Sequence, residues 1–166
     1  MSKGKNPKPL NQAEYEALAE FRYQLRRYLR FMEERSREAG QNPQQYLLVL
    51  AIKGLPRETR PTIGNLAGRL QLNHNSMVEL VDRCERKGLV RRSRSGSDRR
   101  QVELALTAEG DAVLRKLASA GREELRTIGP LLAQSIQHLI AHDTRVMKHT
   151  GRGSRRAAGG NKKQGP

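Results

Sequence analysis

Two short amphipathic segments, set close together and followed by an arginine-rich hairpin pattern, constrain the fold more than any other feature of this sequence. In residues 62–70, Thr62 is a suitable N-cap, and apolar residues recur at spacings of three and four. In residues 73–88, Asn73 is the expected N-cap, and Gly88 follows as a helix stop signal. Two helices joined by so few residues must cross at a large angle, which holds the second helix out from the body.

The second of these helices has an apolar face and a polar face. If Met77, Leu80, Val81 and Cys84 point inward, a step of 100° per residue places Asn75, Glu79, Asp82 and Arg86 opposite them, with Ser76 and Arg83 alongside. The first turn of a helix held out in this way is where DNA bases and phosphates are usually contacted. We therefore predict DNA contacts from His74, Asn75, Ser76, Glu79 and Arg83. Ordinary solvation also produces a polar outer face, so this helix alone leaves both interpretations open.

The hairpin pattern favours the DNA-binding interpretation. Residues 89–93 are expected to form one strand, residues 95–98 a turn, and residues 101–106 the return strand. Five of the ten residues from 91 to 100 are arginines: Arg91, Arg92, Arg94, Arg99 and Arg100. Like charges at this density repel unless an anion compensates them, and a minor groove with its phosphates would do so. The alternative is a merely soluble basic loop. The predicted fold is mainly α with a small β-hairpin wing, a winged helix-turn-helix.

Two runs of sequence resemble the MarR family of bacterial winged-helix regulators. They are L-A-G-R-L-Q-L-N-H-N-S-M-V-E-L-V-D-R-C-E-R-K-G-L-V-R-R and S-D-R-R-Q-V-E-L-A-L-T-A-E-G, which together span residues 66–110. The resemblance implies that Asp98 and Arg100 pair and shape the wing, that an arginine reaches the minor groove, and that Arg99 or Arg94 also lies near DNA. It further implies a transcription regulator, for which we expect repression, and a homodimer formed by interlocking terminal helices.

Positive charge is concentrated on the proposed DNA-reading unit. The chain carries a formal net charge of +15, of which residues 57–100 contribute +6, whereas residues 11–56 contribute +1 and residues 101–147 contribute −1. The remainder lies in the two ends, +3 in residues 1–10 and +6 in residues 148–166. This distribution is typical of a nucleic-acid-binding protein whose flanking helices are left for packing.

The rest of the chain is expected to flank this unit with helices. We expect a disordered basic segment at 1–10, a dimerisation helix at 11–40, the winged helix-turn-helix domain at 41–107, C-terminal dimerisation helices at 108–147 and a disordered basic tail at 148–166. The first helix carries a heptad seam of Leu18, Phe21, Leu25, Tyr28 and Met32. Gly129-Pro130 is expected to break the C-terminal segment into two helices. The tail either attracts DNA or only adds solubility.

No pattern in the sequence points to catalysis. It contains no P-loop, no G-x-S-x-G motif and no H-E-x-x-H motif, so we expect a non-enzyme without a cofactor. Its one cysteine, Cys84, is expected to be a buried small hydrophobe rather than a redox sensor. His138 and His142 have a metal-compatible spacing but lack a third ligand, so we expect exposed histidines rather than a metal site. No segment resembles a membrane span or a signal peptide, and we expect a cytoplasmic location.

A small-molecule effector and a second kind of function also remain open. The MarR resemblance implies a small aromatic or anionic effector, for which the tyrosines Tyr15, Tyr23, Tyr28 and Tyr46 and the arginines of the first helix offer stacking surface and charge. No spacing selects among them. The alternative function is a general nucleic-acid-binding or nucleoid-associated protein that acts mainly through its basic tails.

Overall fold

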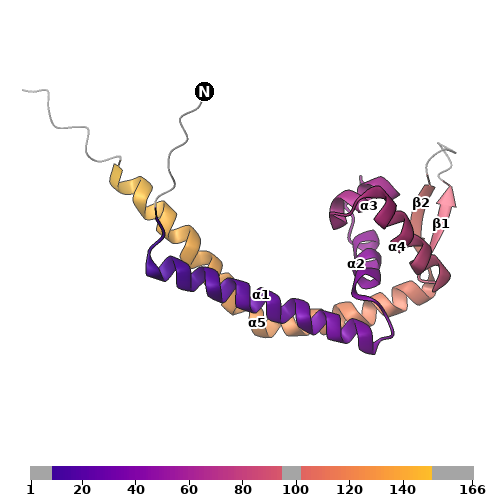
Figure 1. Cartoon of the computed structure of the whole chain (residues 1–166), viewed down its shortest axis with the longest axis horizontal. Coiled ribbons are helices and arrows are strands. Elements are labelled where there is room, and N and C mark those ends of the chain that lie inside the picture. Colours follow the sequence, from indigo (N-terminus) through magenta and orange to yellow (C-terminus); the bar gives the residue numbers. More distant parts are fainter. Residues whose placement is uncertain (1–8, 95–101, 151–166) are drawn as a thin grey trace, which may run out of the picture. The chain divides into compact units, whose positions relative to one another are not determined.

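The computed structural model describes residues 9–94 and 102–150. In chain order, the elements are the helices α1 (Gln12–Glu38), α2 (Pro43–Lys53), α3 (Ile63–Leu70) and α4 (His74–Arg86), the strands β1 (Val90–Arg94) and β2 (Val102–Leu106), and the helix α5 (Ala108–Thr150) (Figure 1). The predicted fold class, mainly α with one antiparallel hairpin, is confirmed. The chain divides into two compact units, Arg26–Thr127 and Met1–Leu25 with Ile128–Pro166, and α1 and α5 each contribute residues to both.

Side-chain caps fix where the first two helices begin. The backbone N–H of Asn11 donates to Glu14 Oε2 at 2.7 Å, and the N–H of Glu14 donates to Asn11 Oδ1 at 3.0 Å. Asn42 and Gln45 form the same reciprocal box before α2, where Pro43 occupies the first helical position. These boxes satisfy backbone donors that the first turn of a helix leaves without partners. Both helices therefore begin directly after a capping asparagine.

The turn between α3 and α4 is as tight as the sequence indicated. Thr62 Oγ1 accepts a hydrogen bond from the N–H of Asn65 at 3.3 Å, and Asn73 Oδ1 accepts one from Ser76 at 2.8 Å. Between them, Gln71 adopts a left-handed conformation with φ of 55°, and the N–H of Leu72 bonds back to the carbonyl of Ala67 at 3.0 Å. This arrangement closes α3 and turns the chain sharply into α4.

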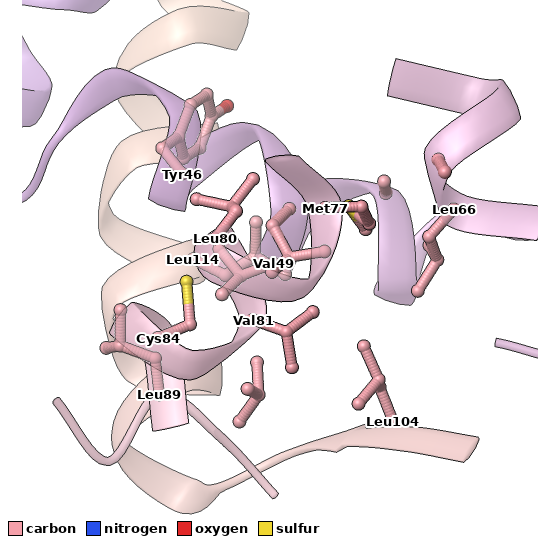
Figure 2. Close-up of a cluster of buried hydrophobic side chains, with 14 of the residues drawn as sticks. Tyr46, Val49, Leu66, Met77, Leu80, Val81, Cys84, Leu89, Leu104 and Leu114 are labelled. Carbon is pink, nitrogen blue, oxygen red and sulfur yellow. The ribbon is translucent and has the colours of Figure 1, made fainter. Parts of the chain in front are cut away.

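The core of the larger unit gathers around the inner face of α4 (Figure 2). Its four apolar positions, Met77, Leu80, Val81 and Cys84, are at most 1% exposed. They lie in one buried cluster with side chains from α2, α3, β2 and the first turns of α5, namely Leu48, Val49, Leu66, Leu104, Leu114 and Leu117. Burying apolar surface stabilises the folded state by about 25 cal/mol per Å². This face of α4 therefore packs inward, and the opposite face remains outside.

The hairpin is attached to the helix-turn-helix at its return strand. Val90 pairs with Leu106 and Arg92 with Leu104 in an antiparallel register. Leu104 is buried, and its N–H donates to the carbonyl of Pro61 at 2.9 Å, just before α3 begins. The two strands are therefore held by the core on one face and by the segment before α3 at one edge.

The predicted break at Gly129-Pro130 is wrong, because α5 runs without interruption from Ala108 to Thr150 with Pro130 inside it. Its start is as expected, since Thr107 Oγ1 caps the N–H of Gly110 at 3.0 Å. Proline removes one hydrogen bond and restricts the residue before it partly through that residue's Cβ. Gly129 has no Cβ, so the helix passes through the pair. The C-terminal part is one helix, not two.

The helix α2 is apolar but only partly buried. Tyr46, Leu48, Val49 and Ala51 lie in the core, but Leu47 and Leu50 are 46% and 39% exposed. In the part of the chain that the structure describes, no helix combines the length and hydropathy needed to cross a membrane.

Candidate nucleic-acid interface

The outer face of α4 is polar and open to solvent. The predicted contact residues His74, Asn75, Glu79 and Arg83 are exposed, and Ser76 is half-buried. Asn73, His74, Asn75, Ser76 and Glu79 line a shallow hollow of about 440 Å³ at the start of the helix. The division of α4 into an inner and an outer face is therefore confirmed, and the hollow lies at the positive end of the helix dipole.

The outer face includes a row of side chains at a spacing of four, Asn75, Glu79 and Arg83. Glu79 and Arg83 form an ion pair in which Arg83 Nη1 and Glu79 Oε2 are 3.8 Å apart. Their side chains remain 71% and 44% exposed, respectively. An exposed pair at this distance is weakly held, so both groups are available to another partner.

Arg92 has a role that the sequence did not suggest. Its Nη2 lies 2.5 Å from Asp82 Oδ1, its Nη1 bonds to Glu85 Oε2, and its backbone N–H donates to Glu85 Oε1 at 3.2 Å. The hydrogen bond to Asp82 raises the pKa of Arg92 further above its usual range. Strand β1 is thereby fastened to α4, and the charge of Arg92 is neutralised within the protein.

Strand alternation could have revealed this role. Val90 is buried on the inner face of β1, so Arg92, two residues later, shares that face, whereas the exposed Arg91 lies on the other. The hypothesis that five arginines crowd the wing as free charges must therefore be corrected for Arg92. The side chain of Arg94 and all of Asp98, Arg99 and Arg100 lie outside the described residues, so their predicted DNA contacts and the Asp98–Arg100 pair stay predictions.

The segment before α3 adds a second polar edge. Arg57 is exposed, and Arg60 Nε lies 3.8 Å from Glu103 Oε1 on β2. An open hollow of about 860 Å³ is lined there by residues of the 58–65 segment and by Val102. Both arginines are candidates for phosphate contact.

Cys84 behaves as a core residue. It is fully buried on the inner face of α4, and burial raises the pKa of its thiol to about 11. A thiol that stays protonated near neutral pH is a poor nucleophile. Among the described residues, no group of three histidine, cysteine or carboxylate side chains is arranged to hold a metal ion.

A separate cavity of about 190 Å³ lies between α1 and α2 in the larger unit. Its lining includes Tyr28, Met32, Ser36, Tyr46, Leu47 and Leu50. Of the four tyrosines named as effector candidates, only Tyr28 and Tyr46 line it, while Tyr15 and Tyr23 are more than half exposed in the other unit. Burial raises the pKa of Tyr28, and burial together with Tyr28 raises that of Tyr46, so both hydroxyls stay neutral donors.

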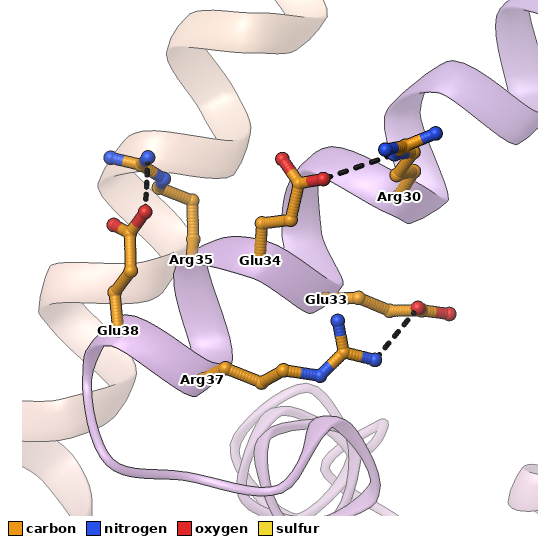
Figure 3. A network of polar contacts seen from close by, with 6 residues as sticks. All are labelled: Arg30, Glu33, Glu34, Arg35, Arg37 and Glu38. Carbon is orange, nitrogen blue, oxygen red and sulfur yellow. Dashed lines mark hydrogen bonds and ion pairs between the residues drawn. The ribbon is translucent and has the colours of Figure 1, made fainter.

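The arginines of α1 near this cavity are already paired (Figure 3). Arg30 bonds to Glu34 at 3.0 Å, Arg37 to Glu33 at 3.3 Å, and Arg35 to Glu38 at 2.6 Å. Glu33 is the charged residue among the described lining of the cavity. The surroundings therefore suit an uncharged aromatic ring better than an anion.

A helix-turn-helix followed directly by a hairpin that is fastened to the outward-facing helix defines a winged helix-turn-helix protein. The sequence profile of the MarR family matches residues 39–101, which cover α2, α3, α4 and β1. Over this winged helix-turn-helix part, the chain is therefore similar to the MarR family.

Individual transcriptional regulators show the same similarity. The chain is 32% identical over 104 residues to the transcriptional regulator PecS of Dickeya dadantii, covering 62% of this chain and 61% of PecS. It is 28% identical over 94 residues to the transcriptional repressor MdtR of Bacillus subtilis, covering 57% and 58%. The matches to curated relatives cover 44% to 61% of the relatives' own lengths. The fold also resembles Sco3205, a MarR family regulator of Streptomyces coelicolor solved in complex with DNA, with a TM-score of 0.62, 24% identity and coverage of 91% of this chain and 95% of that chain.

Proposed function

We propose that this protein is a dimeric transcription regulator that binds a pseudo-palindromic DNA site. The observation that carries the proposal is α4, whose apolar face is fully buried while Asn75, Glu79 and Arg83 remain on the outside. In this geometry, α4 enters the major groove, where His74 and Ser76 complete the contact, and the wing with Arg94, Asp98, Arg99 and Arg100 reaches the minor groove. A DNA partner implies a cytoplasmic location.

The test is selection of bound duplexes from a random pool with the full-length protein. We expect an inverted repeat with half-sites about one helical turn, roughly 34 Å, apart. Replacing Arg99 and Arg100 by alanine should weaken binding to all sequences. For every phosphate that the variant no longer neutralises, the log–log salt slope should become shallower by about 0.9. Recovery of no preferred sequence would reject the proposal.

Trimming the two basic ends separates this function from general nucleic-acid binding. We expect site-specific binding to survive removal of residues 1–10 and 148–166, with some loss of affinity at low salt. Near-complete loss of duplex binding would favour a nucleoid-associated protein that acts through its tails.

Dimerisation is supported by the apolar side chains that the smaller unit leaves exposed. Tyr15 and Tyr23 are 56% and 60% exposed on α1, and Leu131 and Ile136 are 40% and 41% exposed on α5. Exposed apolar residues gathered in one unit are typical of an interface. We expect an Ile136→Glu variant to sediment as a monomer and the Gln137→Glu variant beside it to remain a dimer.

Repression is supported by the relationship to MdtR, which is described as a repressor. The direct measurement is expression of a reporter gene whose promoter carries the selected site. We expect the protein to lower expression, and a rise in expression would assign it as an activator.

An effector is supported by the cavity between α1 and α2. Its volume of about 190 Å³ suits one aromatic ring, since a cavity of about 150 Å³ holds benzene. The neutral hydroxyls of Tyr28 and Tyr46 can donate hydrogen bonds to such a ligand. We expect phenol to raise the melting temperature of the protein more than the anion salicylate does, and a Tyr28→Phe variant to lose part of this rise.

A further inference from the structure

We infer that Glu79 is a specificity residue that selects cytosine in the DNA read by α4. The inference rests on the proposed function, because it requires α4 to lie in the major groove. It begins from an electrostatic problem: α4 carries three carboxylates, Glu79, Asp82 and Glu85, on a helix proposed to approach a polyanion.

Two of the three carboxylates are paired with one arginine of the wing. Asp82 and Glu85 both bond to the guanidinium of Arg92, and Glu85 also accepts the backbone N–H of that residue. Carboxylate oxygens of Asp82 and Glu85 therefore already accept hydrogen bonds from the same chain. The two carboxylates share one positive charge, so a net charge of −1 remains on the trio, but both are held in contacts within the chain.

Glu79 is held differently. Its ion-pair partner Arg83 is 3.8 Å away, which is longer than a hydrogen bond, and the Glu79 side chain is 71% exposed. It also lines the hollow at the start of α4 together with Asn75 and Ser76. Glu79 thus offers acceptor oxygens on the face proposed to meet the bases.

The chemistry of a carboxylate limits what it can accept there. A carboxylate has no proton to donate, so phosphates and the acceptor atoms of guanine and thymine repel it. Cytosine presents its N4 amino group with an acceptor on one side only, the O6 of the paired guanine, whereas the amino group of adenine lies between two acceptors, its own N7 and the O4 of the paired thymine. Glu79 should therefore lower the affinity of the protein for most DNA sequences. A hydrogen bond from the N4 amino group of cytosine should offset this loss of affinity. The two other residues of the row can form bidentate hydrogen bonds with bases, Asn75 with adenine and Arg83 with guanine.

The test compares wild type, Glu79→Gln and Glu79→Lys in selection from random duplexes, followed by binding measurements on single-base variants of the selected site. For wild type, we expect cytosine at one position of each half-site. Glu79→Gln should reduce discrimination at that position by about tenfold and leave the other positions unchanged. Glu79→Lys should change the preference there from cytosine to guanine, because lysine donates to the O6 and N7 acceptors of guanine.

A matched control separates base reading from charge alone. Glu109→Gln removes one exposed negative charge at the start of α5, outside the helix proposed to read DNA. Both glutamine variants should bind random-sequence DNA more tightly, but only Glu79→Gln should lose discrimination. Identical selected sites for wild type, Glu79→Gln and Glu79→Lys would overturn the role of Glu79 and leave the proposed function intact. No selected site for wild type would overturn both.

Discussion

The guanidinium of Arg92 on β1 lies 2.5 Å from the carboxylate of Asp82 on α4, and this contact joins the wing to the helix proposed to read DNA. The same guanidinium also bonds to Glu85. One side chain between the two elements thus adds a direct link to the buried contacts that hold the wing against α4.

We predict that Arg92→Ala weakens binding to the selected site without changing the salt dependence of binding, because Arg92 contacts no phosphate. Stability should fall by about 1 kcal/mol, the loss expected for a partly exposed ion pair. In an Asp82→Asn, Glu85→Gln background, the same substitution should cost little affinity. The exposed neighbour Arg91 is the control, and Arg91→Ala should leave stability unchanged. An equal loss of affinity from Arg92→Ala in both backgrounds would mean that Arg92 contacts DNA directly.

Gly110 marks a close approach between α5 and the start of the hairpin. A Cβ at this position would lie 1.9 Å from the carbonyl oxygen of Leu89, which is backbone and cannot move freely. Gly110→Ala should therefore lower the free energy of unfolding by about 3 kcal/mol, as overpacking does. Gly68→Ala in α3, where a Cβ would meet nothing within 4 Å, should instead raise it by about 0.5–1 kcal/mol. Urea unfolding measures both, and equal effects would contradict the close packing at Gly110.

The buried thiol of Cys84 makes a prediction about pH. Its pKa is raised from 9.0 to about 11, so the unfolded chain loses the thiol proton at a lower pH than the folded chain. Stability should therefore fall as the pH rises from about 9 towards 11. Cys84→Ser should make this fall shallower without abolishing it, since the raised pKa values of Tyr28 and Tyr46 act in the same direction. Denaturant midpoints between pH 8 and 11 measure the slope, and parallel curves for the two proteins would contradict the burial of the thiol.

Pro130 should weaken α5 although the helix continues through it. Pro130→Ala restores one helical hydrogen bond and should raise the free energy of unfolding by up to about 3 kcal/mol. Gly129→Ala is the second substitution to test, alone and combined with Pro130→Ala, because a Cβ on the residue before proline disfavours the helical conformation. It should destabilise the wild type but stabilise the Pro130→Ala variant. The same effect of Gly129→Ala in both backgrounds would show that the pair does not strain the helix.

Local signals predicted much of this fold. Thr62, Asn73 and Thr107 all cap helices, and the inner face of α4 is composed of the four residues named from its periodicity. These successes share a cause, since capping and helical periodicity depend on residues a few positions apart.

The failures concern interactions that spacing alone does not encode. Gly129-Pro130 breaks a helix only if the free energy lost with one hydrogen bond exceeds the free energy gained by packing the helix on either side. The left-handed conformation of Gln71 follows from the crossing of α3 and α4, because glutamine has no preference for it. The partners of Arg92 lie 10 and 7 residues away on another element, and only the alternation of β1 pointed towards them.

The central claim, that the outer face of α4 lies in the major groove, can be tested by attaching a DNA-cleaving iron chelate at Asn75. In an Asn75→Cys variant, the new thiol is exposed while Cys84 is fully buried, so the reagent should attach at position 75 alone. On the selected duplex, we predict two clusters of cuts, one within each half-site and about one helical turn apart. Cuts spread evenly along the duplex, or confined to its ends, would contradict the account.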